Sequence, residues 1–322
     1  MKTLDGLVWV PKWVSYIGAL KGCQDFLGIE NSDAWVYGTS GHAFILNIHN
    51  ELCPSGPTSW KSNRMTELSM NGGCNIESIV SHKFQKGFED AQKKAWNRVR
   101  YAVDRGLPAF GWEMAIPEYY VIYGYDKKRY IFHGPMRQNT ISRVAWDELG
   151  KTEIGFLEIY IISPANPPND ELVVRDALEY AVAWSDSSNE WTLPDYTGGP
   201  MGYDVWIGVL ENDKADGLGV AYNAAVWAEC RYHAVDFLRE AKNRLNDSMM
   251  LLFNDAIARY KSVSENLNLV SETYPFMETS DEQRERNVKD PKRKGIAIRA
   301  LERAKRAEEK GIVSLKRILE SL

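Results

Sequence analysis

Cys23-Gln-Asp-Phe-Leu-Gly28 stands near the start of this 322-residue chain, and Pro117-Glu-Tyr-Tyr-Val-Ile-Tyr-Gly-Tyr-Asp126 follows much later. Around the first stretch, apolar residues recur at helical spacing over 15–28, and Gly22 and Gly28 interrupt them, which predicts either one broken helix or a loop and a short helix. The second stretch is rich in aromatic and β-branched residues, so we expect a strand over 119–125. The thiol is therefore expected on or beside a helix, and a sheet is expected later in the chain.

Helix and strand patterns around this pair extend the prediction. We expect a helix over 86–105, because Gly106 is suited to its C-terminal cap and Pro108 stops its continuation. Strands are predicted for Pro108–Met114, Arg129–His133 and Gly155–Ile162, and a short one for Ala43–Ile48. A helix followed by an antiparallel sheet predicts the α+β class.

A change of pattern near residue 166 divides the chain. The Pro- and Asn-rich run 163–169 reads as a linker, so we expect an α+β domain over 1–165 and a helical domain over 166–322. Asn169 or Asp170 can cap the first helix of the second domain. Further helices are predicted for 201–211, 219–245, 246–272 and 294–321, with the helical domain covering the cleft of the first.

Composition excludes several classes of protein. The net charge of −5 offers no basic field for nucleic acid, and no apolar run is long enough to span a membrane. The first residues lack the apolar block of a signal peptide, so we expect a cytoplasmic protein with its four cysteines reduced. Eleven Trp and sixteen Tyr suit either a pocket for a small organic ligand or an aromatic core.

Cys23 is the candidate nucleophile, since a thiol at a helix N-terminus can be held as the thiolate. If the helix begins at Ser15 instead, Cys23 lies inside the helix, on or near its buried face. The base is harder to assign. His42, beside a glycine, and Glu118 are the candidates, with His133 a second choice.

An acidic and aromatic pocket is the other candidate site. Trp112, Glu113, Glu118 and Tyr119 lie in or beside two neighbouring strands, where they could hold a polar or cationic ligand or simply face solvent. No metal or cofactor is expected, because the zinc-competent residues form no closely spaced ligand pair; they are His42, His49, Cys53, Cys74 and His82.

These motifs are similar to those of the butirosin-biosynthesis acyltransferase family, whose papain-like domain is followed by a helical domain. The resemblance rests on Cys23–Gly28, Gly38-Thr-Ser-Gly-His-Ala-Phe44, Gly106-Leu-Pro-Ala-Phe110 and Tyr120–Asp126, and on Met201-Gly-Tyr-Asp-Val-Trp206 in the helical half. It implies a papain-like cysteine-peptidase-type fold with Cys23 as nucleophile and a histidine just before Gly124-Tyr125-Asp126. Glu118 and Tyr119 stand where that histidine is expected.

Two functions follow as hypotheses. The first is amide or thioester chemistry on a small molecule, by an acyltransferase or amidohydrolase, and the resemblance implies a carrier-protein thioester as acyl donor. The catalytic residues would be Cys23, His42 and Glu118. The substrate would be bound by Trp112, Glu113, Tyr119 and Asp126. The second is a binding protein that keeps the cleft without the chemistry.

A third hypothesis is a protein-interaction module that uses the C-terminal helices. It requires the apolar stripe on residues 297–319 to be exposed. The sequence leaves open whether the chain forms an oligomer.

Overall fold

The computed structural model describes residues 1–135, 140–246, 249–277 and 279–322. Within these ranges the chain forms two compact units. The first unit contains Met1–Ser32 and Gly72–Pro167, and the second contains Asp33–Asn71 and Pro168–Leu322. The chain leaves the first unit close to the expected linker. The segment 33–71, which the sequence assigned to the first domain, belongs to the second unit because its backbone bonds to helices of the C-terminal half.

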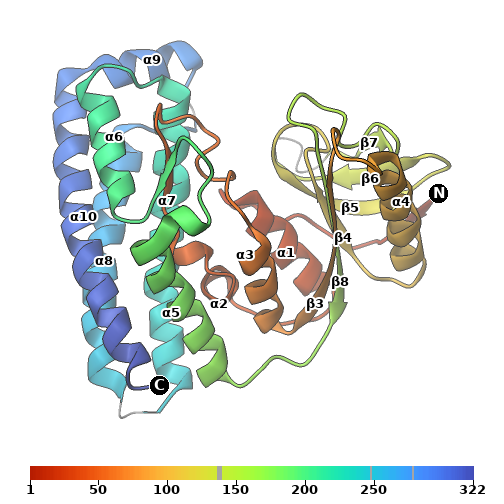
Figure 1. Cartoon of the computed structure of the whole chain (residues 1–322), viewed down its shortest axis with the longest axis horizontal. Coiled ribbons are helices and arrows are strands. Elements are labelled where there is room, and N and C mark those ends of the chain that lie inside the picture. The colour runs from red at the N-terminus through yellow and green to blue at the C-terminus, as the bar shows by residue number, and fades with distance from the viewer. Residues whose placement is uncertain (136–139, 247–248, 278) are drawn as a thin grey trace. The chain divides into compact units, whose positions relative to one another are not determined.

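The first unit is built on a seven-stranded antiparallel sheet of order β3-β8-β4-β5-β6-β7, with β1 paired to β5. Figure 1 shows helices α1 and α4 on opposite faces of this sheet. The prediction of the α+β class is confirmed. The elements are β1 (Lys2–Thr3), α1 (Ser15–Phe26), β3 (Cys74–His82), α4 (Phe88–Asp104), β4 (Ala109–Trp112), β5 (Tyr119–Tyr125), β6 (Arg129–His133), β7 (Ser142–Ala145) and β8 (Phe156–Pro164).

Helix α1 begins at Ser15 and runs unbroken through both of its glycines. These glycines allow the backbone before the helix to cross it closely. A Cβ atom would stand 2.4 Å from Val10 O at Gly18 and 1.9 Å from Val8 O at Gly22. Gly22 therefore marks a close backbone approach and does not break the helix, contrary to the sequence-based expectation.

Three other parts of the first unit compare directly with expectation. Gly106 ends α4 with a φ of +74°, in the left-handed conformation that glycine favours. β5 and β6 have the expected bounds. Strand β3 had no clear sequence signal, because its polar residues interrupt the apolar ones, and it owes its place to nine consecutive pairings with β8.

The second unit is mainly helical and holds a small two-stranded sheet, β2–β9. Helix α8 packs against both α7 and α10. The elements are α2 (Asp33–Thr39), η1 (His42–Phe44), β2 (Asn47–His49), α3 (Asn63–Ser69), α5 (Asp170–Ser187), η3 (Ser188–Glu190), β9 (Tyr196–Gly198), α6 (Met201–Glu211), α7 (Gly217–Arg244), α8 (Met250–Thr273), α9 (Asp281–Lys289) and α10 (Pro291–Leu319); η2 (Met70–Gly72) lies at the junction of the units. The strand expected over 43–48 is instead a 3₁₀ turn followed by β2.

The arginine of a buried ion pair between two C-terminal helices also binds the segment 33–71. Arg231 of α7 binds Glu308 of α10 through two nitrogens, and both side chains are fully buried, at 0% and 1% exposure. The same guanidinium donates to the carbonyls of Ala43 and Ile45, at 3.0 and 2.8 Å. Tyr203 of α6 also donates to Glu308. These bonds explain why residues 33–71 fold with the second unit.

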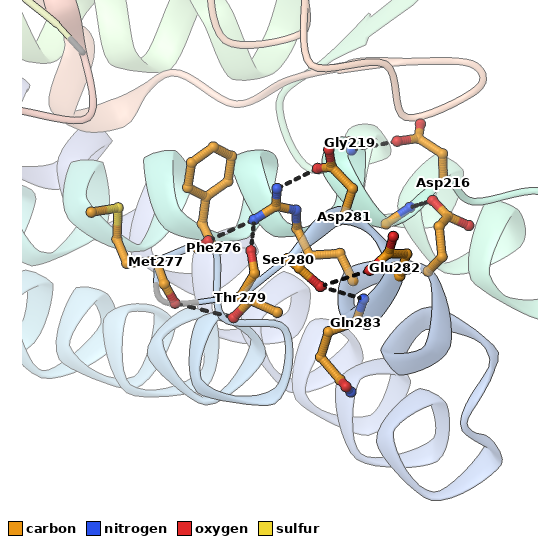
Figure 2. Close-up of polar contacts among 12 residues, drawn as sticks. Asp216, Gly219, Phe276, Met277, Thr279, Ser280, Asp281, Glu282 and Gln283 are labelled. Carbon is orange, nitrogen blue, oxygen red and sulfur yellow. Dashed lines mark hydrogen bonds and ion pairs between the residues drawn. The ribbon is translucent and has the colours of Figure 1, made fainter. Parts of the chain in front are cut away.

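Caps order the helix ends around α9. Asp216 accepts from the N–H of Gly219 at 2.7 Å and Glu285 accepts from Gly217 at 2.6 Å, so two carboxylates hold the start of α7. Figure 2 shows the neighbouring turn, where Ser280 caps α9 by accepting from Gln283. As expected, Asn169 caps α5, accepting from Leu172 N at 2.8 Å.

The apolar stripe of α10 is buried within the second unit. Its core residues Ala297, Leu301, Ala304 and Leu315 have no exposed surface. The interaction-module hypothesis required this stripe to be exposed, so these contacts do not support it. No helix in the described part of the chain is long and apolar enough to cross a membrane.

Removing Glu308 should leave the Arg231 guanidinium buried without its counter-charge. We expect Glu308→Ala to lower the free energy of unfolding by about 3–5 kcal/mol, since an uncompensated buried charge is strongly destabilising. Urea unfolding followed by the helical circular dichroism signal measures this loss. The matched control is Asp186→Ala, which breaks the exposed pair with Lys316 and should cost less than about 1 kcal/mol. Equal effects of the two substitutions would contradict this account.

Candidate active site at the start of helix α1

The first residue of α1 meets the first residues of β5 in the first unit. Ser15 Oγ donates a hydrogen bond to Glu118 Oε2, and the backbone N–H of Tyr119 donates to the same Ser15 oxygen at 3.0 Å. Ser15 is 3% exposed, and Glu118 is half-buried. The residue before Ser15 is Val14, whose side chain cannot cap the helix. A hydroxyl and a carboxylate therefore share a hydrogen bond at the positive end of a helix dipole.

Aromatic rings from α1 and three strands surround this contact. Tyr16 packs edge-on against Phe110 and Tyr119, each at 5.3 Å between ring centroids. Phe110 stacks on Tyr160 at 4.9 Å, and Trp112 lies 4.9 Å from Tyr119. These rings fix the direction in which the start of α1 faces the sheet.

A second carboxylate lies within this aromatic group. Glu158 Oε2 accepts from the hydroxyls of both Tyr119 and Tyr160, at 2.7 and 2.9 Å. Burial raises the pKa of Glu158, and the two phenol hydrogen bonds oppose that rise. Burial, with the nearby Glu158 charge, also raises the pKa of Tyr119 well above its ordinary value. Within the described residues no lysine or arginine forms an ion pair with Glu158.

Glu113 has an unusual backbone and a satisfied side chain. Its φ of +54° is in the left-handed region, and such strain in a non-glycine residue is often found at functional sites. Its N–H donates to Glu118 O at 2.9 Å, which closes the loop before β5. Its carboxylate accepts from Thr152 Oγ1 at 2.6 Å, and burial raises its pKa. Glu113 therefore anchors the loop that carries Glu118.

Asp126, expected to contact substrate, holds the β5–β6 turn instead. Its carboxylate accepts from the Arg129 guanidinium and from the N–H groups of Lys128 and Arg129. The Arg129 hydrogen bond is the main reason that the pKa of Asp126 is lowered. These bonds give Asp126 a structural role and leave its substrate contact without support.

The surroundings of Cys23 do not favour a thiolate. Cys23 lies in the third turn of α1, two turns after the helix start, and has no exposed surface. Burial, and then the proximity of Cys74, raises its pKa well above the ordinary range. Catalytic cysteines require the opposite shift. Since the helix begins at Ser15, Cys23 takes the buried position that the sequence had left open, and its predicted role as nucleophile gains no support.

The two histidines proposed as bases are also held in place. His42 Nδ1 lies 3.0 Å from Ser40 Oγ, which donates to Tyr37 O, and burial lowers the pKa of His42 to about 3. His42 belongs to the second unit and Cys23 to the first. His133 shares a hydrogen bond with Leu7 O at 3.0 Å, and burial lowers its pKa. These contacts favour structural roles.

The structure thus brings together four of the predicted site residues, namely Trp112, Glu113, Glu118 and Tyr119. Sequence reasoning missed their main partners, Ser15 and Glu158. One signal could have found Ser15: it precedes the apolar helical pattern, and serine is preferred at helix starts. No local signal marks Glu158, because only the pairing of β8 beside β4 places it near the site.

Comparison with protein-family models and with curated proteins finds no match for this chain. No group of three or more metal-binding side chains occurs among the residues that the structure describes. The arrangement at α1 therefore has to be judged on its own chemistry, which is that of a hydroxyl, two carboxylates and several phenols.

Thiol labelling of the native protein tests the position of Cys23. Cys53 is half-buried, whereas Cys23, Cys74 and Cys230 are buried. We expect iodoacetamide to modify Cys53 alone between about pH 6 and 8.5, and to reach the others only after denaturation. Peptide mass mapping locates the label. Modification of native Cys23 at the acidic end of this range would show that its thiol is activated after all.

The depressed pKa of His42 predicts a pH-dependent stability. The imidazole is neutral when folded and binds a proton at about pH 6.5 when unfolded, so stability is full above that pH. As the pH falls from about 6.5 towards 3, unfolding takes up a proton at His42. This uptake should lower the free energy of unfolding by up to about 1.4 kcal/mol per pH unit. Urea unfolding over this pH range should show that the free energy of unfolding falls less steeply with pH in His42→Asn than in the unaltered protein. Identical slopes would exclude this contribution.

Proposed function

We propose that this protein carries out acyl transfer or hydrolysis on a small amide or thioester, with Ser15 as nucleophile and Glu118 as base. The observation that carries the proposal is the hydrogen bond from Ser15 Oγ to Glu118 at the start of α1. Nucleophilic catalysis needs a hydroxyl or thiol in contact with a proton acceptor. The comparable contact at the start of α9, from Ser280 Oγ to Glu282 Oε2, is longer, at 3.5 Å, and both of its residues are exposed.

The fold supports the same proposal through the order of its elements. A helix that begins with the candidate nucleophile packs on an antiparallel sheet, and the candidate base lies in the loop directly before strand β5 of that sheet. This is the order expected of a papain-like domain. Ser15 would take the place of the cysteine, and Glu118 the place of the histidine that the resemblance implies. The papain-like assignment is part of the proposal.

The chemistry can be written step by step from these residues. The Ser15 hydroxyl gives its proton to the Glu118 carboxylate while Oγ attacks the acyl carbon. The bond from that carbon to sulfur or nitrogen then breaks, and the leaving group takes the proton. The acyl group, held as an ester on Ser15, passes to water or to an amine.

Backbone N–H groups at the start of α1 are suited to stabilise the negative charge that develops on the carbonyl oxygen. They lie at the positive end of the helix dipole, which favours a developing negative charge. The N–H of Tyr119 already donates to Ser15 Oγ and so holds the nucleophile in position.

A binding protein without chemistry is the second candidate, and Glu158 favours it. A carboxylate flanked by two phenols and several rings, with no basic side chain of the described residues paired to it, suits recognition of a polar ligand. Ser15 Oγ is also engaged by two partners, as a purely structural hydroxyl would be. The two candidates differ in one respect, which is whether Ser15 forms a covalent bond.

Intact-mass analysis after incubation with short-chain N-acetylcysteamine thioesters or a fluorophosphonate tests the enzyme proposal. We expect one adduct on Ser15, none on Ser15→Ala, and acylation slowed about 10²–10⁴-fold in Glu118→Gln, because that variant lacks the proton acceptor. Cys53→Ala, which removes the half-buried thiol, should form the adduct at the rate of the unaltered protein.

The outcomes separate the candidates. An adduct that maps to a cysteine, or one that survives Ser15→Ala, would refute the role of Ser15. Binding of an unreacted thioester without any adduct, lost in Glu158→Gln, would establish the binding protein instead. Circular dichroism of each variant confirms that it is folded.

A further inference from the structure

Strand β3 forms one edge of the seven-stranded sheet. It pairs with β8 on one side through a continuous register from Cys74↔Pro164 to His82↔Phe156, without a bulge. No other described strand pairs with its second side. A strand of nine residues with a free edge presents a row of backbone donors and acceptors that another strand can use.

The two edges of the sheet differ in their protection. The opposite edge, β7, has four residues and carries Arg143, so it is short and charged, as protected edges usually are. β3 is long and regular, and contains neither proline nor lysine. Its one charged residue, Glu77, is neutralised by Arg98 of α4 through two hydrogen bonds. Of the usual devices against edge pairing, β3 lacks proline, lysine, a bulge and a short length, and only His82 N–H at its end is bound by a loop side chain, that of Gln85.

The side chains on one face of β3 are open to solvent. Val80 is 55% exposed, Ser78 is also exposed, and Ile76 is half-buried. On the other face, Ile79 and Ser81 are buried. α4 packs against β3. Val80 and Ile76 therefore keep apolar surface beside the free edge, and pairing with another strand would bury part of it.

We propose that β3 pairs antiparallel with β3 of a second copy of this chain, about a two-fold axis that passes beside Ser78. Residues whose numbers sum to twice 78 then stand opposite each other across the interface. Ile76 faces Val80 of the second copy on the open side, and Glu77 faces Ile79 on the side of α4. The two sheets become one continuous sheet.

The strand is complementary to itself in this register. Direct cross-strand pairs of β-branched residues stabilise a sheet, and Ile76 opposite Val80 forms two such pairs per dimer. Like charges opposite each other would oppose pairing, but each Glu77 faces an isoleucine. A symmetric interface requires such self-complementarity, whereas binding of an unrelated peptide does not. This feature selects a second copy as the partner.

Light scattering coupled to size-exclusion chromatography of the full chain tests the proposal over a range of concentrations. We expect a particle of twice the 36.7 kDa chain mass. Val80→Lys should give a folded monomer, because it places a charge at the edge and opposite Ile76. Leu251→Lys is the control with the same change of charge, at a residue of α8 that is 81% exposed, and it should remain a dimer.

A cross-linking pair tests the register. Ser78→Cys should be joined to its own copy by a short bismethanethiosulfonate linker, because the axis brings these two positions together. Asn75→Cys, whose two copies lie at opposite ends of the paired strands, should not be joined. A wild-type monomer at every concentration would overturn the proposal. So would a dimer that survives Val80→Lys while Ser78→Cys fails to cross-link.

Discussion

The hydrogen bond between Ser15 and Glu118 joins the start of α1 to the sheet of the first unit. It joins the first residue of α1 to the residue directly before strand β5, and the N–H of Tyr119 donates to the same serine oxygen. A hydrogen bond to a charged group contributes about 1.5–3 kcal/mol, more than a neutral one. The close crossing of Val8–Val10 over Gly18 and Gly22 places α1 where this bond can form.

The site combines groups with opposite requirements. Glu118 must accept a proton in the proposed reaction, whereas burial favours the neutral form of Glu158. Two carboxyl groups with different surroundings are a common arrangement where acid and base roles are divided. Tyr119 connects them, because its N–H holds Ser15 and its hydroxyl binds Glu158. A substitution at Glu118, Tyr119 or Glu158 should therefore alter the hydrogen bonds of the other two residues.

Much of the fold could be predicted from the sequence, and the misses have physical causes. Strong local signals gave α4 with its Gly106 cap, the β5–β6 hairpin and the Asn169 cap of α5. The place of 33–71 was missed because it depends on long-range bonds to a buried arginine. β3 was missed because its polar and apolar residues show no simple period.

The candidate site was predicted only in part, because sequence patterns reveal residues that are close along the chain and miss those that long-range packing brings together. Glu118, Tyr119, Trp112 and Glu113 are close in sequence, so their common location could be inferred from two neighbouring strands. Cys23 drew attention through its chemistry, but side-chain chemistry does not reveal burial. The glycines of α1 suggested a break, but they make room for the backbone of Val8–Val10 and the helix runs through them unbroken.

The central claim is that residues 15 and 118 form a nucleophile–base pair, and rebuilding that pair with a thiol and an imidazole tests it most directly. Cleavage after Lys12 and Lys21 separates residue 15 from Cys23, so peptide mapping can follow the alkylation of each. In Ser15→Cys combined with Glu118→His, we expect iodoacetamide to react at residue 15 at about pH 6 at least ~10-fold faster than in Ser15→Cys alone, because a neighbouring imidazolium lowers a thiol pKa. Equal rates in the two folded variants would contradict the account.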